Sequence, residues 1–224
     1  MILEQVERET EDEWRPKRIV SQFRGSELGD CPRSIQYYLL GYEPERPKPE
    51  LALLFSDGHL HHNSLRQRLS SVGRVTNTEQ VAWKEYDIQG IKFSIGGTCD
   101  CHFNTFIGEL KGINFFSFKN LNKESLPRFY KKYIDQIQAY LDIFDKEWGF
   151  LLFKCKMTSA LKLFWIKRDR EYFQKVLNRL AKIQLAIQHK KMLKRPFTKS
   201  SKKCKGCFMR KHCWGISMER REWK

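Results

Sequence analysis

The chain has 224 residues, a hydrophobic content of 41%, and 42 Lys and Arg residues against 26 Asp and Glu, which gives a net charge of +16. This length suffices for one large domain with its own core, or for a domain with an appendage. The basic balance favours a polyanionic partner such as nucleic acid, although a surplus of basic residues can also serve solubility alone.

Membrane insertion and secretion are not expected. No apolar run reaches the ~20 residues that a membrane-spanning helix requires, and no secretory signal follows the start methionine. We therefore expect a cytoplasmic protein that has no membrane partner and keeps its seven cysteines reduced. In a reducing compartment, metal ligation by cysteine is favoured over disulfide formation.

Charge is distributed unevenly along the chain. The first fourteen residues are acidic, whereas the segment from Lys190 to the end holds thirteen Lys and Arg residues against two Glu. The sequence shows neither a repeat nor a low-complexity linker. A single folded domain with charged ends is therefore the simplest prediction.

The hydrophobic pattern predicts a mixture of helices and strands. Helices are expected over residues 26–40, 51–72, 126–144 and 170–189. Strands are expected between about 75 and 111, with breaks at Gly90 and Gly96-Gly97, and over residues 149–155 and 161–167. This order of elements predicts an α/β fold, with a mixed sheet and helices on both of its faces.

Among the helices, the one over residues 51–72 carries a histidine on its apolar stripe. The stripe follows a 4-3-4-3 spacing and consists of Leu51, Phe55, Gly58, His62, Leu65, Leu69 and Val72. His62 lies on it, whereas His59 and His61 do not. We expect His62 to be either a hydrogen-bonded core residue or a metal ligand, and Gly58 to mark the close approach of another backbone.

Residues 97–111 can form a β-hairpin with a two-residue turn at Asn104-Thr105, because Asn tolerates the positive φ of such turns. In this register Asp100 lies opposite Glu109, and Lys111 lies one step further along the same face. The other face would receive an apolar set, namely Cys99, Cys101, Phe103, Phe106 and Leu110. A turn longer by one residue would break the register.

The predicted pairing of two carboxylates suggests a metal site. Carboxylates that lie directly opposite each other repel, and a divalent cation between them would turn this repulsion into binding, with the oxygen ligands that Mg²⁺ and Mn²⁺ prefer. Lys111 would then lie beside a scissile phosphate, where it could orient water or stabilise charge. The alternative is a surface hairpin with scattered charges.

The helix over residues 126–144 presents Gln136 and Tyr140 on one face, because they are four residues apart. The same face carries Tyr133, Ile137 and Phe144, so it should point into the protein. A buried amide needs hydrogen-bond partners. The pair could belong to a structural network, or it could reach the edge of the site to orient Lys111 or contact DNA.

Cysteines near the C-terminus have the spacing Cys204-x2-Cys207-x5-Cys213, which is typical of metal binding. Cys31 is the best candidate for a fourth ligand, since the other cysteines fall within predicted strands. Four thiolates suit either Zn²⁺ or an iron–sulfur cluster. His212 could instead complete a local zinc site with the three downstream cysteines.

Taken together, these motifs resemble the RecB-type nucleases of the PD-(D/E)xK superfamily, and most closely the stand-alone CRISPR-associated and viral exonucleases that hold a [4Fe–4S] cluster. The resemblance covers residues 26–214. Its motifs occur in the family's order: Cys31-Pro32-Arg33, Gly58 to His62, Gly97 to Asp100, Glu109 to Lys111, Gln136 to Tyr140, and the three downstream cysteines.

The resemblance implies a restriction-endonuclease-like sheet in a nuclease core at residues 20–190, between an acidic segment at 1–19 and a cysteine-rich tail at 191–224. The tail would be clasped to the N-terminal helix by the cluster. It also implies roles for the following residues: His62, Asp100, Glu109 and the Leu110 carbonyl as Mg²⁺ or Mn²⁺ ligands; Lys111, Gln136 and Tyr140 as further catalytic residues; and Cys31, Cys204, Cys207 and Cys213 as ligands of [4Fe–4S].

The leading hypothesis is therefore a metal-dependent DNA exonuclease that acts on single-stranded ends. Its setting would be a prokaryotic cytoplasm, in phage recombination or replication or in CRISPR spacer acquisition, with protein partners from those pathways. The alternative is a catalytically silent module that binds DNA or a partner and holds zinc or an iron–sulfur cluster. Such a module would bind DNA in a salt-sensitive way without turnover.

Overall fold

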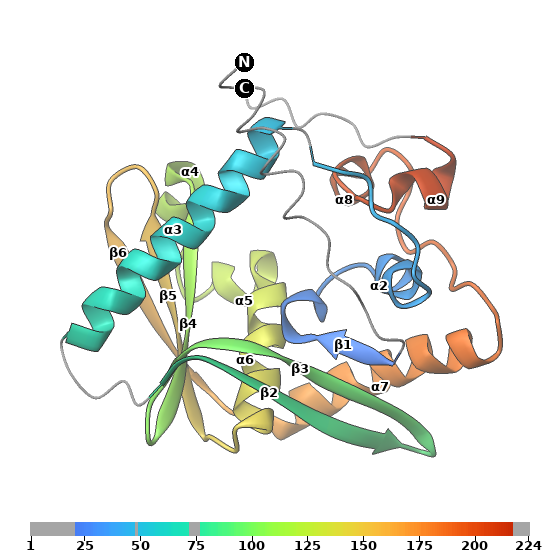
Figure 1. Cartoon of the computed structure of the whole chain (residues 1–224), viewed down its shortest axis with the longest axis horizontal. Helices are drawn as coiled ribbons and strands as arrows, with labels where there is room; N and C mark the ends of the chain where they lie inside the picture. The colour runs from blue at the N-terminus through green and yellow to red at the C-terminus, as the bar shows by residue number, and fades with distance from the viewer. Residues whose placement is uncertain (1–20, 48, 72–76, 217–224) are drawn as a thin grey trace.

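The computed structural model describes residues 21–47, 49–71 and 77–216. These residues form a mixed six-stranded sheet with helices on both faces, which confirms the predicted α/β class (Figure 1). None of the described helices combines the length and apolar character that a membrane crossing needs. The acidic segment 1–19 and the last basic residues of the tail, 217–224, lie outside the described residues.

The sheet is organised around the long strand β3. Its strands are β1 (Gln22–Arg24), β2 (Asn77–Ile88), β3 (Ile91–His102), β4 (Phe106–Ile113), β5 (Trp148–Cys155) and β6 (Leu161–Lys167). Strand β2 runs antiparallel along one edge of β3. The other edge pairs with β1 in parallel and, near its end, with β4 in antiparallel orientation. Beyond β4 follow β5, which is parallel to β4, and then β6, which is antiparallel to β5.

Helices cover the two faces of this sheet. The longer ones are α2 (Pro32–Leu39), α3 (Pro49–Ser71), α6 (Lys131–Ile143) and α7 (Arg170–Gln188). The shorter ones are the 3-10 turn η1 (Gly25–Glu27), α4 (Phe115–Lys119), α5 (Ser125–Phe129), α8 (Lys202–Lys205) and α9 (Arg210–Trp214). Figure 1 shows α3 crossing one face of β4 and β5, with α6 on the opposite face.

Each face has its own apolar core. Leu65 of α3 packs with Cys101, Leu110, Phe150 and Leu152 on one side of the sheet. On the other side, Ile137, Tyr140 and Leu141 of α6 pack with residues of β4 and β5. A third cluster joins α2 and α7 to β1 and β3. The strands β3 and β4 therefore lie between α3 and α6, and residues at their junction are shielded from solvent by both helices.

The helix predicted over residues 26–40 begins later than expected. Helix α2 starts at Pro32, with Cys31 as its N-cap residue and a separate 3-10 turn before it. Proline favours the first helical position because its missing N–H would have no partner there. Cys31 therefore lies just before the helix, not within its first turns.

The helix predicted over residues 126–144 is two helices. Tyr130 has φ −118° and ψ 24°, so it separates α5 from α6. The apolar spacing continues across this break, which is why the pattern alone predicted one helix.

In β3, the expected break at Gly96-Gly97 is absent. The strand continues through both glycines, and Gly96 makes room for the Trp83 ring of β2, because a Cβ there would lie 2.3 Å from it.

Candidate active site between β3 and β4

The site is built on the hairpin between β3 and β4, which has the predicted register. Cys101 pairs with Gly108, His102 pairs with Ile107, and the turn lies at residues 104–105. Beyond these two residue pairs, β3 and β4 separate. The Asp100 carboxylate takes the place of the next backbone hydrogen bond between the strands, since its Oδ2 accepts the Leu110 backbone N–H at 2.8 Å. The gap between β3 and β4 thus holds polar side chains in an otherwise apolar layer.

One face of the hairpin departs from the prediction. Phe103, Phe106 and Leu110 lie together with Cys101 on the α3 side, as expected, but Cys99 packs on the α6 side with Ile107. The Cys99 thiol is directed to the Cys101 and Gly108 carbonyl oxygens at 3.2 and 3.6 Å. Strict alternation therefore fails across residues 99–101. The irregularity falls where β3 parts from β4 around Asp100.

Helix α3 brings His62 to the site. The Nδ1 atom of His62 lies 3.5 Å from Asp100 Oδ1, and Arg66, one turn further along the helix, places its guanidinium 3.9 Å from the same oxygen. Burial alone would raise the pKa of Asp100, but the His62 hydrogen bond, the Lys111 charge and the Leu110 N–H together hold it below its usual value. Asp100 is thus kept as a carboxylate although it is only 8% exposed.

Glu109 lies deeper in the protein, where it is 2% exposed. Its Oε1 accepts hydrogen bonds from Lys111 Nζ at 2.5 Å and from Gln136 Nε2 at 2.6 Å. Its Oε2 is buried and has no hydrogen-bond partner among the described residues. Burial raises the pKa of Glu109 to about 8 in spite of the Lys111 ammonium, and the negative charge of Asp100 contributes to the rise.

Lys111 is held by charge and by an aromatic ring. Burial would lower the pKa of Lys111, but the charges of Glu109 and Asp100 raise it above its usual value. The Lys111 Nζ atom also lies 5.2 Å from the centre of the Tyr133 ring, at cation–π distance. The ammonium therefore stays charged beside the two carboxylates.

Tyr140 closes the back of the site. Its hydroxyl lies 3.5 Å from Gln136 Nε2, and its ring packs against two glycines. Gly97 has φ +151°, and a Cβ there would lie 2.7 Å from the Tyr140 hydroxyl oxygen. This close approach gives a physical reason for a glycine three residues before Asp100. It also links the Gly97–Asp100 segment to the Gln136–Tyr140 segment.

Of the residues near His62 on α3, His61 agrees with the prediction and Gly58 does not. His61 points away from the carboxylates, with its Nδ1 3.4 Å from Lys154 Nζ, which agrees with its place off the apolar stripe. Gly58 does not mark a close approach, because a Cβ there would meet no described atom within 4 Å. Val72, the last residue of the predicted stripe, lies outside the described residues.

The structure brings together six of the predicted site residues: His62, Asp100, Glu109, Lys111, Gln136 and Tyr140. Leu110 lies among them, with its side chain fully buried. Arg66 and Tyr133 also contact the site but were not predicted from the sequence as site residues. Arg66 could have been found, since it is four residues from His62 and so shares its face of α3. Tyr133 was placed on the inward face of its helix, but nothing in the pattern indicated its contact with Lys111.

The donor chemistry suits a divalent cation, because the site offers two carboxylates and an imidazole, and one buried carboxylate oxygen has no partner. Within the described ranges, however, no group of three or more His, Cys, Asp and Glu side chains is arranged as a ready metal cage. Ligation would therefore require small rotations of these side chains, and Lys111 would have to share Glu109 with the ion.

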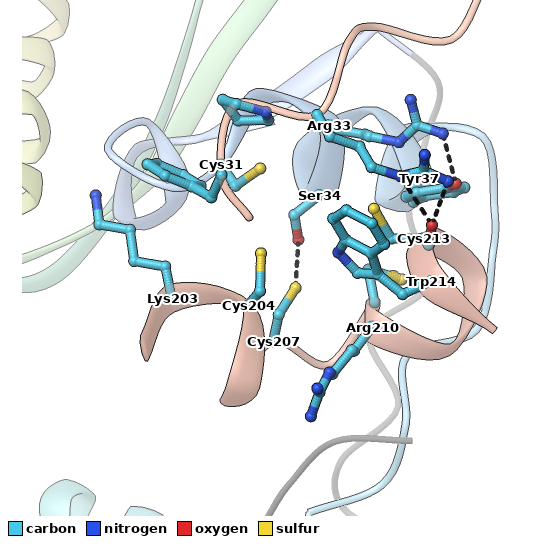
Figure 2. A pocket seen from close by; sticks show the side chains of 14 residues that line it. Cys31, Arg33, Ser34, Tyr37, Lys203, Cys204, Cys207, Arg210, Cys213 and Trp214 are labelled. Atoms are coloured by element: carbon cyan, nitrogen blue, oxygen red, sulfur yellow. Dashed lines mark hydrogen bonds between the residues drawn. The ribbon is translucent and has the colours of Figure 1, made fainter. Parts of the chain in front are cut away.

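A pocket lies where the C-terminal tail meets α2. Cys31, Cys204, Cys207 and Cys213 line one pocket, whose other walls include Ser34, Arg195 and Trp214 (Figure 2). Cys207 donates a hydrogen bond to Ser34 Oγ at 3.7 Å. Burial raises the pKa of Cys31 and of Cys207, and for both of them the neighbouring thiols add to the rise.

His212 is engaged elsewhere, which argues against a local zinc site made with the three downstream cysteines. Its Nε2 lies 2.7 Å from the Glu43 carbonyl oxygen and its ring packs against Tyr42. It does not line the cysteine pocket. Cys99, Cys101 and Cys155 are fully buried in the sheet, as expected, and so are remote from the pocket wall.

Hydrogen bonds also connect the tail to the N-terminal segment. Gln36 of α2 donates to the Lys191 carbonyl and accepts from the Leu193 N–H. Tyr37 donates to the His212 carbonyl at 3.0 Å, and the Glu45 N–H donates to the Phe208 carbonyl at 2.8 Å. Hydrogen bonds between protein groups therefore hold the tail against α2.

Comparison with known proteins places the fold. No protein-family model and no curated protein matches the chain. Among solved structures, SSO0001 matches with a TM-score of 0.60 and 20% identity, over 93% of this chain and 94% of that chain. The alkaline exonuclease LHK-Exo from Laribacter hongkongensis matches with a TM-score of 0.57 and 13% identity, over 82% of this chain and 93% of that chain.

A phage-related exonuclease from Haemophilus somnus 129PT matches with a TM-score of 0.53 and 16% identity, over 75% of this chain and 94% of that chain. LHK-Exo is also known in complex with dAMP. At these identities the likeness is one of fold: the chain has the mixed α/β architecture of these exonucleases, along nearly their whole length.

Proposed function

We propose that the chain is a metal-dependent DNA exonuclease of the RecB type, which hydrolyses phosphodiester bonds at single-stranded ends. The observation that carries this proposal is the buried group of Asp100, Glu109 and Lys111, in which Glu109 keeps one oxygen without a partner. A purely structural carboxylate would be expected to use both oxygens. The exonuclease architecture of the structural neighbours supports the same reading.

In this proposal His62, Asp100, Glu109 and the Leu110 carbonyl hold a Mg²⁺ or Mn²⁺ ion, which would supply Lewis-acid polarisation of the phosphate. Lys111 presents its ammonium to the phosphate and orients the attacking water. Gln136 fixes Glu109 by its hydrogen bond of 2.6 Å. Tyr140 packs against Gly97 and so holds the strand that carries Asp100.

We further infer that Cys31, Cys204, Cys207 and Cys213 ligate a [4Fe–4S] cluster, which reinforces the contacts between the tail and α2. The four thiols that line one pocket support this inference, since all-thiolate ligation suits such a cluster. Residues 20–190 would be the nuclease core and residues 191–224 the cluster-binding tail. A cytoplasmic role in phage recombination or replication, or in spacer acquisition, with protein partners from those pathways, fits this combination.

The first test is anaerobic purification with an absorbance scan and iron and zinc analysis. Digestion of end-labelled single-stranded DNA with and without Mn²⁺ follows on the same sample. A broad band at about 400 nm is expected from a Cys-ligated iron–sulfur cluster, together with metal-dependent cutting. Asp100→Ala and Lys111→Ala should abolish cutting and retain the band.

Full activity in both variants would show that the site is assigned wrongly. A colourless zinc protein that binds DNA in a salt-sensitive way and never cuts it would instead establish the silent binding module. The two assignments are read separately, because the band reports the cysteine pocket and the digestion reports the carboxylate site.

A further inference from the structure

Two phenylalanines on the short helices that follow β4 are unusually exposed. Phe116 of α4 is 77% exposed and Phe129 of α5 is 68% exposed. A single exposed apolar side chain is ordinary. These two rings, however, belong to short helices that follow β4 directly in the chain, and β4 is the strand that carries Glu109 and Lys111. Their surroundings therefore bear on what approaches the site.

A line of contacts joins the residues that follow these phenylalanines, Ser117 and Tyr130, to Lys111. Phe116 precedes Ser117, and Phe129 precedes Tyr130, whose hydroxyl donates to the Ser117 carbonyl at 3.1 Å. This hydrogen bond ties α4 to the end of α5, the two short helices that carry the exposed rings. The Tyr130 ring is stacked on Tyr133 with centroids 6.1 Å apart, and Tyr133 lies 5.2 Å from the Lys111 ammonium.

Positive charge surrounds the same segment. Residues 111–132 contain six Lys and Arg residues and one acidic residue, Glu124. Arg128 lies over the Phe129 ring at 5.0 Å, and Lys132 lies over the Tyr133 ring at 5.2 Å. An apolar protein partner would meet this charge unfavourably. Aromatic rings interleaved with cations are instead the combination that binds single-stranded nucleic acid, by stacking on bases and attracting phosphates.

We propose that Phe116 and Phe129, with the neighbouring cations Arg128 and Lys132, form a stacking platform for unpaired bases of the DNA strand whose phosphate lies at Lys111. The inference rests on the proposed nuclease function and deepens it, because it names the form of the substrate. A duplex hides the faces of its bases, so the platform engages only a single strand. The platform would thereby give the site its preference for single-stranded ends.

The test measures binding apart from cutting. Fluorescence anisotropy of an end-labelled oligothymidine of about 15 nucleotides, and of a duplex of the same length, is recorded over a salt series with chelator present. Phe116→Ala and Phe129→Ala should each weaken single-strand binding about tenfold and leave duplex binding unchanged. The slope of affinity against salt should stay that of the wild type, since no phosphate contact is lost.

Matched variants separate stacking from charge and from folding. Phe116→Trp should retain single-strand affinity, whereas Lys132→Gln should lower the salt slope. Leu185→Ala, at an exposed position of α7, should leave affinity unchanged. Circular dichroism confirms that each variant is folded.

Wild-type affinity in both alanine variants would overturn the platform, and so would an equal loss on single strand and duplex. Digestion of single-stranded DNA by the wild-type protein is recorded in parallel. If the wild type cuts while the alanine variants bind normally, the platform is wrong and the nuclease stands. If the wild type never cuts, the failure lies with the proposed function.

Discussion

Two buried carboxylates, Asp135 and Glu109, lie close to α6 but differ in how many hydrogen bonds they accept. Asp135, on α6 itself, has no exposed side-chain surface and accepts hydrogen bonds on both oxygens, from Lys131, Tyr172 and Arg179. Glu109, which Gln136 contacts from the next position of α6, uses one oxygen and leaves the other without a described partner.

The pKa values of Asp135 and Glu109 are shifted in opposite directions. Burial would raise the pKa of Asp135, but its three hydrogen-bond donors lower it. The pKa of Glu109 is raised to about 8, because burial and the charge of Asp100 outweigh the Lys111 ammonium. A saturated carboxylate joins elements of the fold, whereas an unsaturated one retains capacity for a ligand. The contrast therefore separates a structural network centred on Asp135 of α6 from a candidate site centred on Glu109 of β4.

Glu109→Gln should have the largest effect. The amide keeps the shape of Glu109 but removes the charge that would bind a cation, so we expect Mn²⁺-dependent cutting of DNA to fall by about 10³-fold. Stability without metal should change little, because burial raises the pKa of Glu109 to about 8. The buried carboxyl is therefore largely protonated at neutral pH, and the amide replaces one uncharged group by another. Rates from end-labelled DNA and urea unfolding measure the two effects. Substantial activity in Glu109→Gln would remove Glu109 from the site.

Asp135→Asn should show the reverse pattern. It removes the charge that faces Lys131 and Arg179, and Arg179 also donates to the Leu28 carbonyl, so α6, α7 and the segment after η1 lose a shared anchor. We expect a loss of about 3 kcal/mol in the free energy of unfolding, with cutting retained at temperatures where the variant is folded. A variant that is stable but inactive would contradict a purely structural role for Asp135.

Two glutamines of α6 provide a smaller, matched comparison. Gln136 donates to Glu109, whereas Gln138, equally buried, donates to the Lys167 carbonyl and accepts from the Asp169 N–H. Gln136→Ala should lower activity or metal affinity by about 10- to 100-fold, as loss of a residue behind a metal ligand does. Gln138→Ala should cost stability and leave metal affinity intact. A metal titration with activity as the readout distinguishes the two variants. Equal effects on metal affinity would mean that both glutamines have only a structural role.

The smallest expected effect is on the pH dependence of stability in acid. The pKa of Asp135 is lowered on folding from its ordinary value of 3.8, so its contribution to stability is present above that pH and is lost as pH falls through the folded value. The difference in unfolding free energy between wild type and Asp135→Asn should therefore narrow below about pH 4. Urea unfolding over a pH series tests this. A difference that grows on acidification would mean that Asp135 is protonated in the fold.

The arrangement of the site was predictable where local geometry decides it. A two-residue turn fixes the register of the hairpin, so Asp100 and Glu109 followed by counting, and the apolar stripe of α3 selected His62. Contacts between distant elements were not predictable. The packing of Tyr133 on Lys111 depends on how α6 lies over β4, and the displacement of Cys99 depends on the separation of β3 from β4. The position of Cys31 before α2 could have been read from Pro32.

The contacts between α2 and the tail also bear on the order in which the protein matures. Ser34 and Cys207 are in contact across 173 positions of sequence, and the Gln36 side chain is hydrogen-bonded to the backbone of Lys191 and Leu193. During synthesis, α2 leaves the ribosome long before these partners exist. The cysteine pocket can therefore form only after the tail has been made. Any cofactor loaded there would enter at the end of folding, and its presence would mark molecules that have been completed.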